Sequence, residues 1–394
     1  MKQDYFEFSN SVKIVAGKGA LEQLPHILTH NDGYRVFIIS DEIIKSFGHI
    51  DALKKVLAKK EELTIGGTYL DVKSSLTVSD ATKLYTAFRK SGSDSIIGIG
   101  GSRVMNAAKA LALLISTKSK NISEFRGIDS AIREKQVPFM LIPTTFGSGS
   151  EVSKTAVVID EKKEIPIEIV TEVMQPQYCF LEPSFLKTLP EKEIYMSLID
   201  VMAYSIESYI STRANTLTRS FSKMAMFLIK DNFQKAIVEN NDTALSNLQR
   251  ASAISAITYS NTYTGVAHAL ANSLAAKYQI HRGEAICAIL VACLEQLKST
   301  QKDKFAEMLL FYRGTQDYAT STTDERCDAF MRIVSNVIEH LASDYGIKIK
   351  LSEYGVTEDD LASLAELTLL DGELIGAPRQ YTKEDIIEIL RQSL

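Results

Sequence analysis

The sequence lacks several features that would place it in a specialised class of protein. No run approaches the roughly 18 apolar residues that a membrane-spanning helix needs. The N-terminus, MKQDYFEFSNSVKIV, has no apolar core of signal-peptide length and carries acidic residues early. Positive charge is not in excess, because 49 Asp and Glu outnumber 44 Lys and Arg and the net charge is −5. These absences argue against a membrane protein, a secreted protein and a general nucleic-acid binder.

Cysteine is also scarce. The four cysteines are scattered without a CxxC pair, which argues against a disulfide framework or a zinc knuckle. We expect buried or incidental thiols in a reducing compartment, with the cytoplasm as the default. The 394 residues are 45% hydrophobic and 24% charged, which is typical of a globular protein of two or three domains.

The first half of the chain alternates strand and helix patterns. The strand candidates are short apolar runs at residues 34–40, 95–100, 138–145 and 155–160. Amphipathic helical patterns, such as those at 48–63 and 78–92, lie between them. Alternation of this kind predicts βαβ units and a parallel sheet. The continuous apolar run SIIGIG indicates a strand buried on both faces.

Strand signals fade after Leu189 and Pro190, and nearly every later segment reads as helix. Proline agrees with this split, since only Pro378 lies beyond residue 190. The sequence therefore predicts an α/β domain with a parallel sheet over residues 1–187. An all-helical domain is predicted over residues 188–394.

Glycines follow the buried strand in the segment GIGGSRVMNAAKALALL, which starts at Gly98. Without a Cβ, Gly100 and Gly101 let the backbone approach a phosphate, and the following helix offers free N–H groups from Ser102 onward. The segment does not match GxGxxG, so the usual dinucleotide fingerprint is absent. A tight turn that only packs the helix on the sheet is an equal alternative for this segment alone.

A second polar segment, IPTTFGSGSEVSK at residues 142–154, also leaves the end of a predicted strand. Its hydroxyls and N–H groups could bind ribose, phosphate or a nicotinamide amide, although a polar turn is the plainer alternative. Open α/β sheets bind ligands at the C-terminal ends of their strands, which favours binding. Asp41 ends another strand. It could bind an adenosine ribose and disfavour a 2′-phosphate, or cap the next helix.

Candidate metal ligands lie in the helical half. Asp200 and Tyr204 are one helical turn apart, and His268 and His281 follow. One carboxylate and two imidazoles suit Fe or Zn as divalent ions. A phenol is a poor fourth ligand, because it keeps its proton to about pH 10. Taken alone, Asp200, Tyr204 and His268 are each better explained as part of a helical core.

Taken in order, these segments resemble the iron-containing (group III) alcohol dehydrogenase family, within the wider dehydroquinate synthase-like fold. IPTTFGSGSEVSK is similar to the family's PTTxGTGSE segment, and GGSRVMNAAKA to its GGGSxxDxAKA loop. HALANSL and IHRGEAICAIL resemble its HAxAHxxG and HGxxxAxxLP segments, and APRQYTKEDIIEIL its C-terminal tail. The resemblance covers nearly the whole chain.

The resemblance implies that residues 1–187 form a Rossmann-like nucleotide-binding domain and residues 188–394 an all-helical domain for metal and substrate, with the active site between them. It also implies NAD(P)-dependent interconversion of a small alcohol and its aldehyde or ketone, with a metal held by one Asp and three His. Asp41 favours NAD slightly over NADP. The residues expected to contact the dinucleotide are Asp41, Gly100, Gly101, Ser102, Asn106, Lys109, Thr144, Thr145, Ser148 and Ser150.

The chain departs from the family pattern at functional positions. Tyr204 stands where the DxxxH helix has its His, and Asn272 replaces the second His of HAxAH, which lies near the nicotinamide in the family. In the glycine loop, Ser102, Arg103 and Asn106 replace the third Gly, the Ser and the Asp. Arg103 could contact a pyrophosphate or an anionic substrate, or be a solvated charge.

Three interpretations remain. A metal could be bound by Asp200, His268 and His281. The enzyme could work without metal, with Tyr204, His268, His281 or Asn272 as catalytic groups. The protein could also be a non-catalytic nucleotide-binding relative. We rank an enzyme with weak or no metal dependence first, acting on a small molecule as a homodimer or larger homo-oligomer. A lyase of the dehydroquinate synthase type is disfavoured, because the set of basic residues it needs is missing near 268–283.

Overall fold

The structure is a computed structural model that describes residues 5–73, 75–128, 137–162 and 165–394. The chain forms two compact units, described separately below. Residues 10–189 and 238–253 form an α/β unit, and residues 190–237 and 254–394, joined by the N-terminal segment up to Ser9, form a helical unit. This observed fold confirms the predicted class, an α/β parallel-sheet part followed by an all-helical part.

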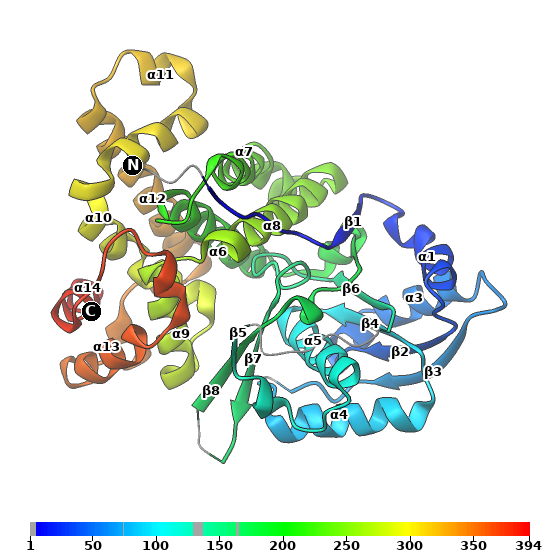
Figure 1. The fold of residues 1–394 in the computed structure, drawn as a ribbon. Coiled ribbons are helices and arrows are strands. Elements are labelled where there is room, and N and C mark those ends of the chain that lie inside the picture. The colour runs from blue at the N-terminus through cyan, green and yellow to red at the C-terminus, as the bar shows by residue number, and fades with distance from the viewer. Residues whose placement is uncertain (1–4, 74, 129–136, 163–164) are drawn as a thin grey trace. The chain divides into compact units, whose positions relative to one another are not determined.

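A six-stranded parallel sheet forms the centre of the α/β unit (Figure 1). Its strands lie in the order β1-β9-β6-β4-β2-β3. Their bounds are β1 (Lys13–Ala16), β2 (Arg35–Ile39), β3 (Thr64–Tyr69), β4 (Ser95–Gly100), β6 (Phe139–Pro143) and β9 (Tyr178–Leu181). The helices are α1 (Leu24–His30), α2 (Glu42–Ser46), α3 (His49–Leu57), α4 (Val78–Ser91) and α5 (Ser102–Thr117).

Both faces of the sheet are covered by helices. Each strand contributes side chains to both faces, because successive side chains of a strand alternate between them. Val36 and Ile38 of β2 pack with residues of α1 and α3, such as Leu28 and Leu53. Phe37 lies on the opposite face, with residues of α4 and α5. The double covering explains why β4 and β6 are buried at every position, as the run SIIGIG predicts.

The predicted strand at residues 155–160 exists, but it is not part of the parallel sheet. It is β7 (Thr155–Asp160), which pairs antiparallel with β8 (Ile165–Val170) in a separate three-stranded sheet completed by β5 (Gly127–Ile128). Its burial alternates along the strand instead of being continuous. A half-exposed strand of this kind suits an antiparallel pair with one solvated face.

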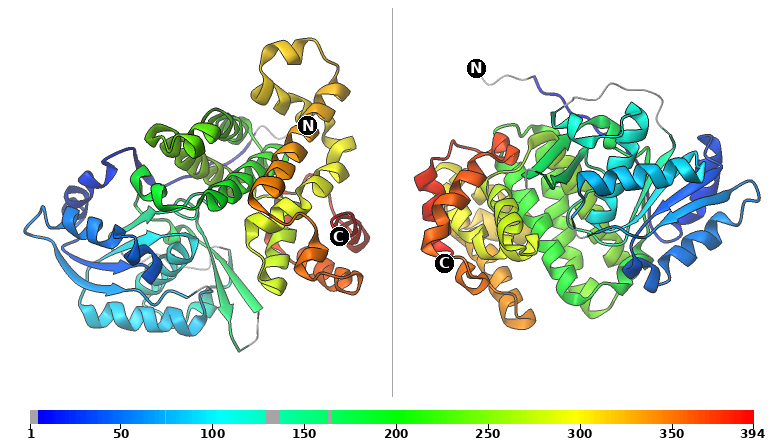
Figure 2. Two further views of the ribbon diagram at one scale, coloured as in Figure 1. Left: turned by 180° about the vertical axis from the view of Figure 1, so that it is seen from behind. Right: turned by 90° about the horizontal axis from the view of Figure 1, so that it is seen from below.

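The helical unit contains no strand among the residues described there. Its helices are α6 (Glu191–Ile210), α7 (Thr216–Val238), α8 (Asp242–Thr262), α9 (Val266–Tyr278), α10 (Arg282–Arg313), α11 (Thr315–Ala319), α12 (Thr323–Tyr345), α13 (Leu361–Leu369) and α14 (Lys383–Gln392). The first part of α8 packs with the α/β unit and the rest with the helical unit. One large apolar core joins α6, α9, α10, α12, α13 and α14, and α10 and α12 run side by side in both views of Figure 2.

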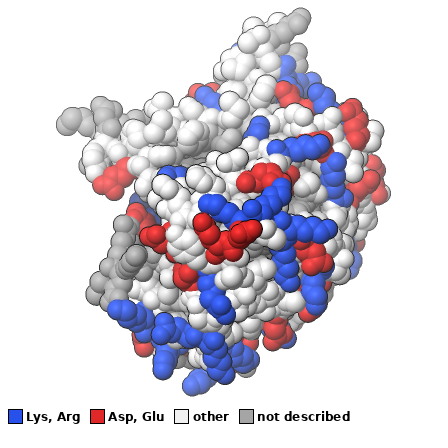
Figure 3. Space-filling model, turned by 90° about the vertical axis from the view of Figure 1, so that its right-hand side faces the viewer, with Lys and Arg blue, Asp and Glu red and all other residues white. Residues whose placement is uncertain are grey.

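The charges on the surface and the hydropathy of the helices agree with the composition. Over the centre of the face drawn in Figure 3, Lys and Arg side chains are interspersed with Asp and Glu side chains. Within the described residues, no helix combines the length and the apolar character needed to cross a membrane.

Candidate active site

The glycine loop connects β4 to α5 at the point where the order of the strands in the sheet reverses. The chain runs from β2 outward to β3 and then returns to β4 on the other side of β2. Asp41 follows β2 and Gly101 follows β4, so both lie at the C-terminal ends of neighbouring strands. Open α/β sheets bind ligands at this kind of switch point.

The backbone of the loop is shaped for close approach. Gly100 has φ 156°, and a Cβ at Gly98 would lie 2.7 Å from the Leu141 side chain. Gly101 precedes α5 without a side-chain cap, so the first N–H groups of a 16-residue helix are open to a ligand. Helix N–H groups that no side chain caps, beside a residue without a Cβ, fit a pyrophosphate. The dinucleotide that the resemblance implies is therefore compatible with these residues.

The 142–154 segment lies beside this loop. The Thr144 N–H donates to the Gly100 carbonyl at 3.0 Å, and a Cβ at Gly101 would lie 3.3 Å from Thr145 Oγ1. Thr144 Oγ1 is buried without a hydrogen-bond partner among the described residues. Ser148 Oγ accepts from the Ser150 N–H at 3.3 Å, which shapes the turn.

Lys109 holds the two segments together from a fully buried position. Its Nζ donates to Ser150 Oγ at 3.0 Å, Ser153 Oγ at 2.8 Å and the Thr155 carbonyl at 3.0 Å. An ammonium has three N–H donors, so all of them are used within the protein. Ser150 Oγ in turn donates to Asn106 Oδ1 at 3.5 Å. Lys109 thus has the geometry of a positioning residue and not that of a direct cofactor ligand.

Asp41 caps the next helix, which is one of its two predicted roles. Its second carboxylate oxygen is not used by the cap, so it can still serve the other predicted role, binding a ribose. Asp41 Oδ1 accepts from the Ile44 N–H at 2.9 Å and caps α2. Asp41 Oδ2 lies 3.9 Å from Arg103 Nη2, so the loop arginine pairs with this carboxylate. The pair places one negative and one positive group beside the glycine loop.

A second cluster of polar residues lies on one face of α6 in the helical unit. Asp200, Tyr204 and Glu207 share this face, because residues four and seven apart in a helix point the same way. All three side chains are buried, with 6%, 4% and 3% of the residue exposed. Buried carboxylates in an apolar helix need partners, and α9 and α10 supply them.

Glu207 holds His268 in place. Glu207 Oε2 lies 2.5 Å from His268 Nδ1, and Glu207 Oε1 accepts from the Ala267 N–H at 2.8 Å. Gly265 makes this approach possible, since a Cβ there would lie 2.8 Å from Glu207 Oε1. His268 Nε2 remains buried without a hydrogen-bond partner among the described residues. Sequence reasoning missed Glu207, although its spacing from Asp200 and Tyr204 on one helix face was a usable signal.

Tyr204 lies flat against aromatic neighbours. Its ring stacks on the His268 imidazole, with centroids 3.8 Å apart and planes at 16°, and on the Tyr259 ring at 4.4 Å and 22°. Burial raises the pKa of the Tyr204 phenol well above 10, and the nearby Arg282 only partly opposes this shift. The phenol is therefore neutral and stacked.

Arg282 occupies the place beside Asp200 where a metal ion was predicted. Its Nη2 and Nε donate to Asp200 Oδ2 at 2.6 Å and 3.2 Å. Its guanidinium carbon lies 5.3 Å from the centroid of the Tyr204 ring. Burial lowers the pKa of Arg282, but the Asp200 carboxylate outweighs this and raises it above its ordinary value. The side chain thus carries a fixed positive charge.

His281, one residue earlier, lies outside this cluster. It is the N-cap of α10, where Nδ1 accepts from the Gly283 N–H at 3.2 Å, and 52% of its side chain is exposed. Its Nε2 is 3.9 Å from Glu193 Oε2. Gly283, whose Cβ would lie 3.0 Å from the Met196 carbonyl, lets α10 pack against α6. Aligning Gly283 with the glycine of HGxxxAxxLP puts Arg282, not His281, at the histidine position.

The residues present do not fit a divalent metal. The predicted ligands Asp200, His268 and His281 are not brought together, and the described part of the chain contains no group of three or more His, Cys, Asp or Glu arranged to hold a metal ion. A guanidinium already pairs with Asp200 Oδ2, and Tyr204 presents a neutral ring. Asp200 Oδ1 and His268 Nε2 are then the remaining atoms of this cluster that could ligate a metal, and a catalytic metal site uses three protein ligands.

Asn272 lies one turn after His268 on α9 and is exposed. Its Nδ2 donates to Asp371 Oδ2 at 3.1 Å. Asp371 begins the short helix η7 (Gly372–Gly376) by accepting from the Glu373 N–H. Asn272 is therefore held at the edge of the cluster by its contact with this segment.

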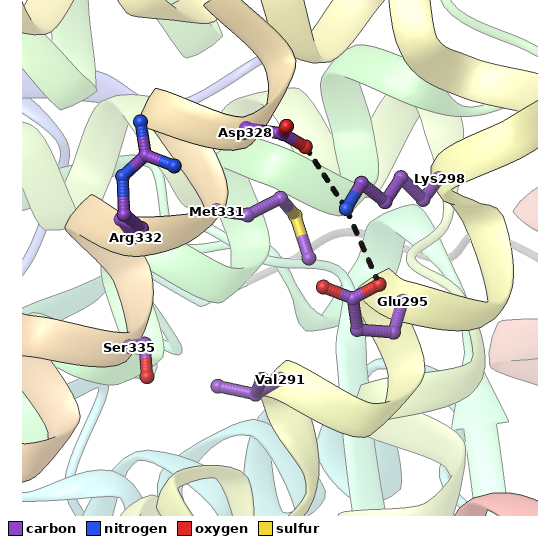
Figure 4. A pocket seen from close by; sticks show the side chains of 7 residues that line it. All are labelled: Val291, Glu295, Lys298, Asp328, Met331, Arg332 and Ser335. Carbon is purple, nitrogen blue, oxygen red and sulfur yellow. Dashed lines mark ion pairs between the residues drawn. The ribbon is translucent and has the colours of Figure 1, made fainter. Parts of the chain in front are cut away.

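A hollow of about 380 Å³ between α10 and α12 contains none of the predicted site residues (Figure 4). Lys298 of α10 pairs across it with Asp328 of α12 at 2.9 Å and also with Glu295 of its own helix at 3.8 Å. Charged groups already paired in this way form a solvated surface and give no reason to assign a ligand there.

Comparison with known proteins agrees with the observed fold. The family model for iron-containing alcohol dehydrogenase matches residues 11–183, and the C-terminal model of the Fe-containing alcohol dehydrogenase family matches residues 194–394. Alcohol dehydrogenase 4 of Saccharomyces cerevisiae is 24% identical over 382 residues, which cover 96% of this chain and 95% of that protein.

Solved structures show the same fold. The crystal structure of 1,3-propanediol oxidoreductase superimposes with a TM-score of 0.92 at 21% identity, covering 99% of this chain and all of that one. Sulfoacetaldehyde reductase from Bifidobacterium kashiwanohense, solved in complex with NAD+, gives a TM-score of 0.85 at 20% identity over 98% of both chains.

Proposed function

The chain belongs to the iron-containing alcohol dehydrogenase family, and we propose that it interconverts a small alcohol and its aldehyde or ketone with a nicotinamide dinucleotide. The observation that carries the proposal is the uncapped N-terminus of α5 behind Gly100 and Gly101, at the switch point of the sheet. A bound dinucleotide would accept or supply the hydride. The protein's own groups would bind it, orient it and exclude water.

The loop residues have distinct tasks in this proposal. The N–H groups of the first turn of α5, starting at Ser102, would bind the pyrophosphate, because they carry the positive end of the helix dipole. Thr144 and Thr145 lie beside Gly101 and would contact the rest of the dinucleotide. Lys109 and Asn106 would act indirectly, because they fix Ser150.

We propose NAD as the preferred dinucleotide. Support comes from the Asp41 carboxylate, whose Oδ2 is not used by the helix cap and can accept from a ribose hydroxyl. Arg103 offsets part of this preference, since its guanidinium attracts a phosphate.

The proposal extends to domain roles, assembly and compartment. Residues 1–187 would bind the nucleotide, and residues 188–394, which hold the Asp200–Arg282 cluster, would bind the substrate. All four cysteines are free and buried, which favours a reducing compartment such as the cytoplasm. A homodimer is the expected assembly, because symmetric dimers are the most frequent oligomers.

The test combines binding with turnover. Purified protein is titrated with NADH and NADPH by fluorescence, and oxidation of each is then followed at 340 nm with a panel of small aldehydes and ketones. The matched control is Gly101→Val, whose side chain would meet Thr145 and block the approach to the loop. Binding and turnover in the wild type, both lost in the control, are expected. Binding without turnover of any panel member would overturn the proposal in favour of a non-catalytic nucleotide-binding protein.

A further inference from the structure

The position of Arg282 leads to an inference that rests on the proposed function and deepens it. We propose that the Arg282 guanidinium replaces the metal ion of this family and is the cation that binds and polarises the carbonyl oxygen of the substrate. The enzyme is then independent of metal, and Arg282 is a catalytic residue.

The first step of the argument concerns charge. Asp200 lies between the buried residues Ile199 and Val201 on α6, and only 8% of its side chain is exposed. A carboxylate in such surroundings requires a nearby positive charge. Arg282 supplies it through two hydrogen bonds to one oxygen. The position that a metal ion would neutralise is already neutralised by the chain itself.

The second step concerns free hydrogen-bonding groups. A guanidinium has five N–H donors, and the bonds to Asp200 use two of them. The Arg282 side chain is 29% exposed, so a small molecule can reach the remaining donors. Arg keeps its charge at any pH at which a protein folds, and its planar donors suit an oxygen that gains negative charge.

The third step identifies a place for a ligand near this cation. Asp200 Oδ1 and His268 Nε2, two buried polar atoms of this cluster, have no hydrogen-bond partner among the described residues. Both atoms belong to residues that lie beside Tyr204 or Arg282. His268 stacks on Tyr204, and Asp200 binds Arg282. Unpaired buried polar atoms cost free energy, which the hydroxyl group of an alcohol ligand would recover by donating to one of them.

The chemistry balances without a metal. In the reduction, a bound dihydronicotinamide would supply the hydride that forms a C–H bond at the carbonyl carbon, and the dinucleotide would be oxidised. The electron pair of the C=O π bond moves to oxygen, where the Arg282 N–H donors stabilise the developing alkoxide. A proton from water then completes the alcohol. The same steps in reverse oxidise an alcohol.

The experiment measures metal content and turnover together. Wild-type protein is incubated with Zn(II) or Co(II), desalted, and analysed by elemental mass spectrometry and by visible absorption of Co(II). A double variant, Tyr204→His with Arg282→His, restores histidine at both altered positions beside Asp200 and His268. The wild type is expected to hold well below one metal per chain, and the double variant to approach one. Adding His281→Ala to the double variant should leave its metal content unchanged.

Turnover tests the catalytic part. Arg282→Gln is expected to lower kcat about 100- to 1000-fold, as loss of an oxyanion donor does, with NADH affinity within twofold of the wild type. Arg282→Lys should recover part of that loss. Asp200→Asn with Arg282→Gln avoids a lone buried charge and guards against simple misfolding. Arg326→Gln on α12, where the side chain lies over Tyr318, is the matched control.

Three results would overturn the inference. Stoichiometric metal in the wild type, or activity lost on chelation and restored by Fe(II) or Zn(II), would refute it while leaving the proposed function intact. Unchanged kcat in Arg282→Gln would do the same. Absence of any carbonyl reduction by protein that binds NADH would refute both the inference and the proposed function.

Discussion

At the scale of single residues, the pair formed by Asp41 and Arg103 bears on the choice of dinucleotide. The carboxylate would repel a 2′-phosphate, and the guanidinium 3.9 Å away would attract one. Asp41→Asn keeps an efficient helix cap but removes the negative charge. We expect the ratio of kcat/KM for NADPH over NADH to rise about fivefold, since loss of a charge interaction worth about 1 kcal/mol changes a ratio by about that factor. Steady-state kinetics with both dinucleotides measure the ratio.

The reciprocal change provides the control. Arg103→Gln leaves the Asp41 carboxylate unopposed and should move the same ratio in the opposite direction. A ratio that neither substitution changes would show that the pair does not face the ribose of the dinucleotide.

Glu207 supports a second prediction at this scale, concerning stability. Glu207→Ala would remove the acceptor of the Ala267 N–H and the partner of His268 Nδ1, both buried. Because each unsatisfied buried group costs about 1–3 kcal/mol, the loss of both partners should lower the free energy of unfolding by about 2–6 kcal/mol. Urea denaturation followed by circular dichroism measures the change.

Glu307→Ala is the matched control for Glu207→Ala. The Glu307 carboxylate accepts one hydrogen bond from the Tyr209 hydroxyl at a partly buried position. Its removal should cost less than half as much. Equal destabilisation by the two variants would contradict the assigned role of Glu207 in holding His268.

At the scale of elements, the connection from β6 through the 142–154 segment to β7 contains a buried acid that should respond to pH. Glu151 is 2% exposed, and burial raises its pKa to about 7, which the nearby Lys109 partly opposes. The unfolded chain loses this proton near pH 4.5 and the folded chain near pH 7. The stability contributed by this group therefore falls as pH rises from about 4.5 to 7.

Glu151→Gln should remove this slope. Relative to the wild type, the variant should gain stability between pH 4.5 and 7, by up to about 3 kcal/mol. Lys109, whose pKa burial lowers to about 7, affects stability only above this window. Glu161→Gln is a control of opposite sign, because hydrogen bonds from Ser79 and Val78 lower the pKa of Glu161. Parallel stability curves for Glu151→Gln and the wild type would contradict the prediction.

The elements also show how much of the structure could be predicted from the sequence. The strand, glycines and helix at residues 95–117 follow from local rules, because burial, conformational freedom and helix capping all depend on neighbouring residues. Local rules do not decide whether His281 or Arg282 lies beside Asp200. Adjacent helical residues point about 100° apart, so a shift of one residue exchanges a buried side chain for an exposed one. The capping geometry at His281 and the packing of Gly283 on Met196 decide it, and both depend on α6.

At the scale of the whole molecule, the two units should respond to different ligands. The dinucleotide is expected to bind the α/β unit, and a metal, if the chain held one, would stabilise the helical unit. A ligand present at 100 times its Kd stabilises the folded state by about 2.7 kcal/mol. NADH should therefore raise Tm and slow amide hydrogen exchange in α5 and the 142–154 segment. Dialysis against EDTA should change neither Tm nor exchange in α6, α9 and α10, because Arg282 and not a metal neutralises Asp200.

The Tyr204→His, Arg282→His double variant makes this comparison decisive. With Asp200 and His268 it offers one carboxylate and three imidazoles, and bound metal should then stabilise its helical unit. Its Tm should fall on dialysis against EDTA and recover with Zn(II), whereas its response to NADH stays that of the wild type. A loss of several degrees from the wild type on dialysis would mean that the helical unit depends on a metal after all. Exchange slowed by NADH in the helical unit alone would contradict the assignment of the dinucleotide to the glycine loop.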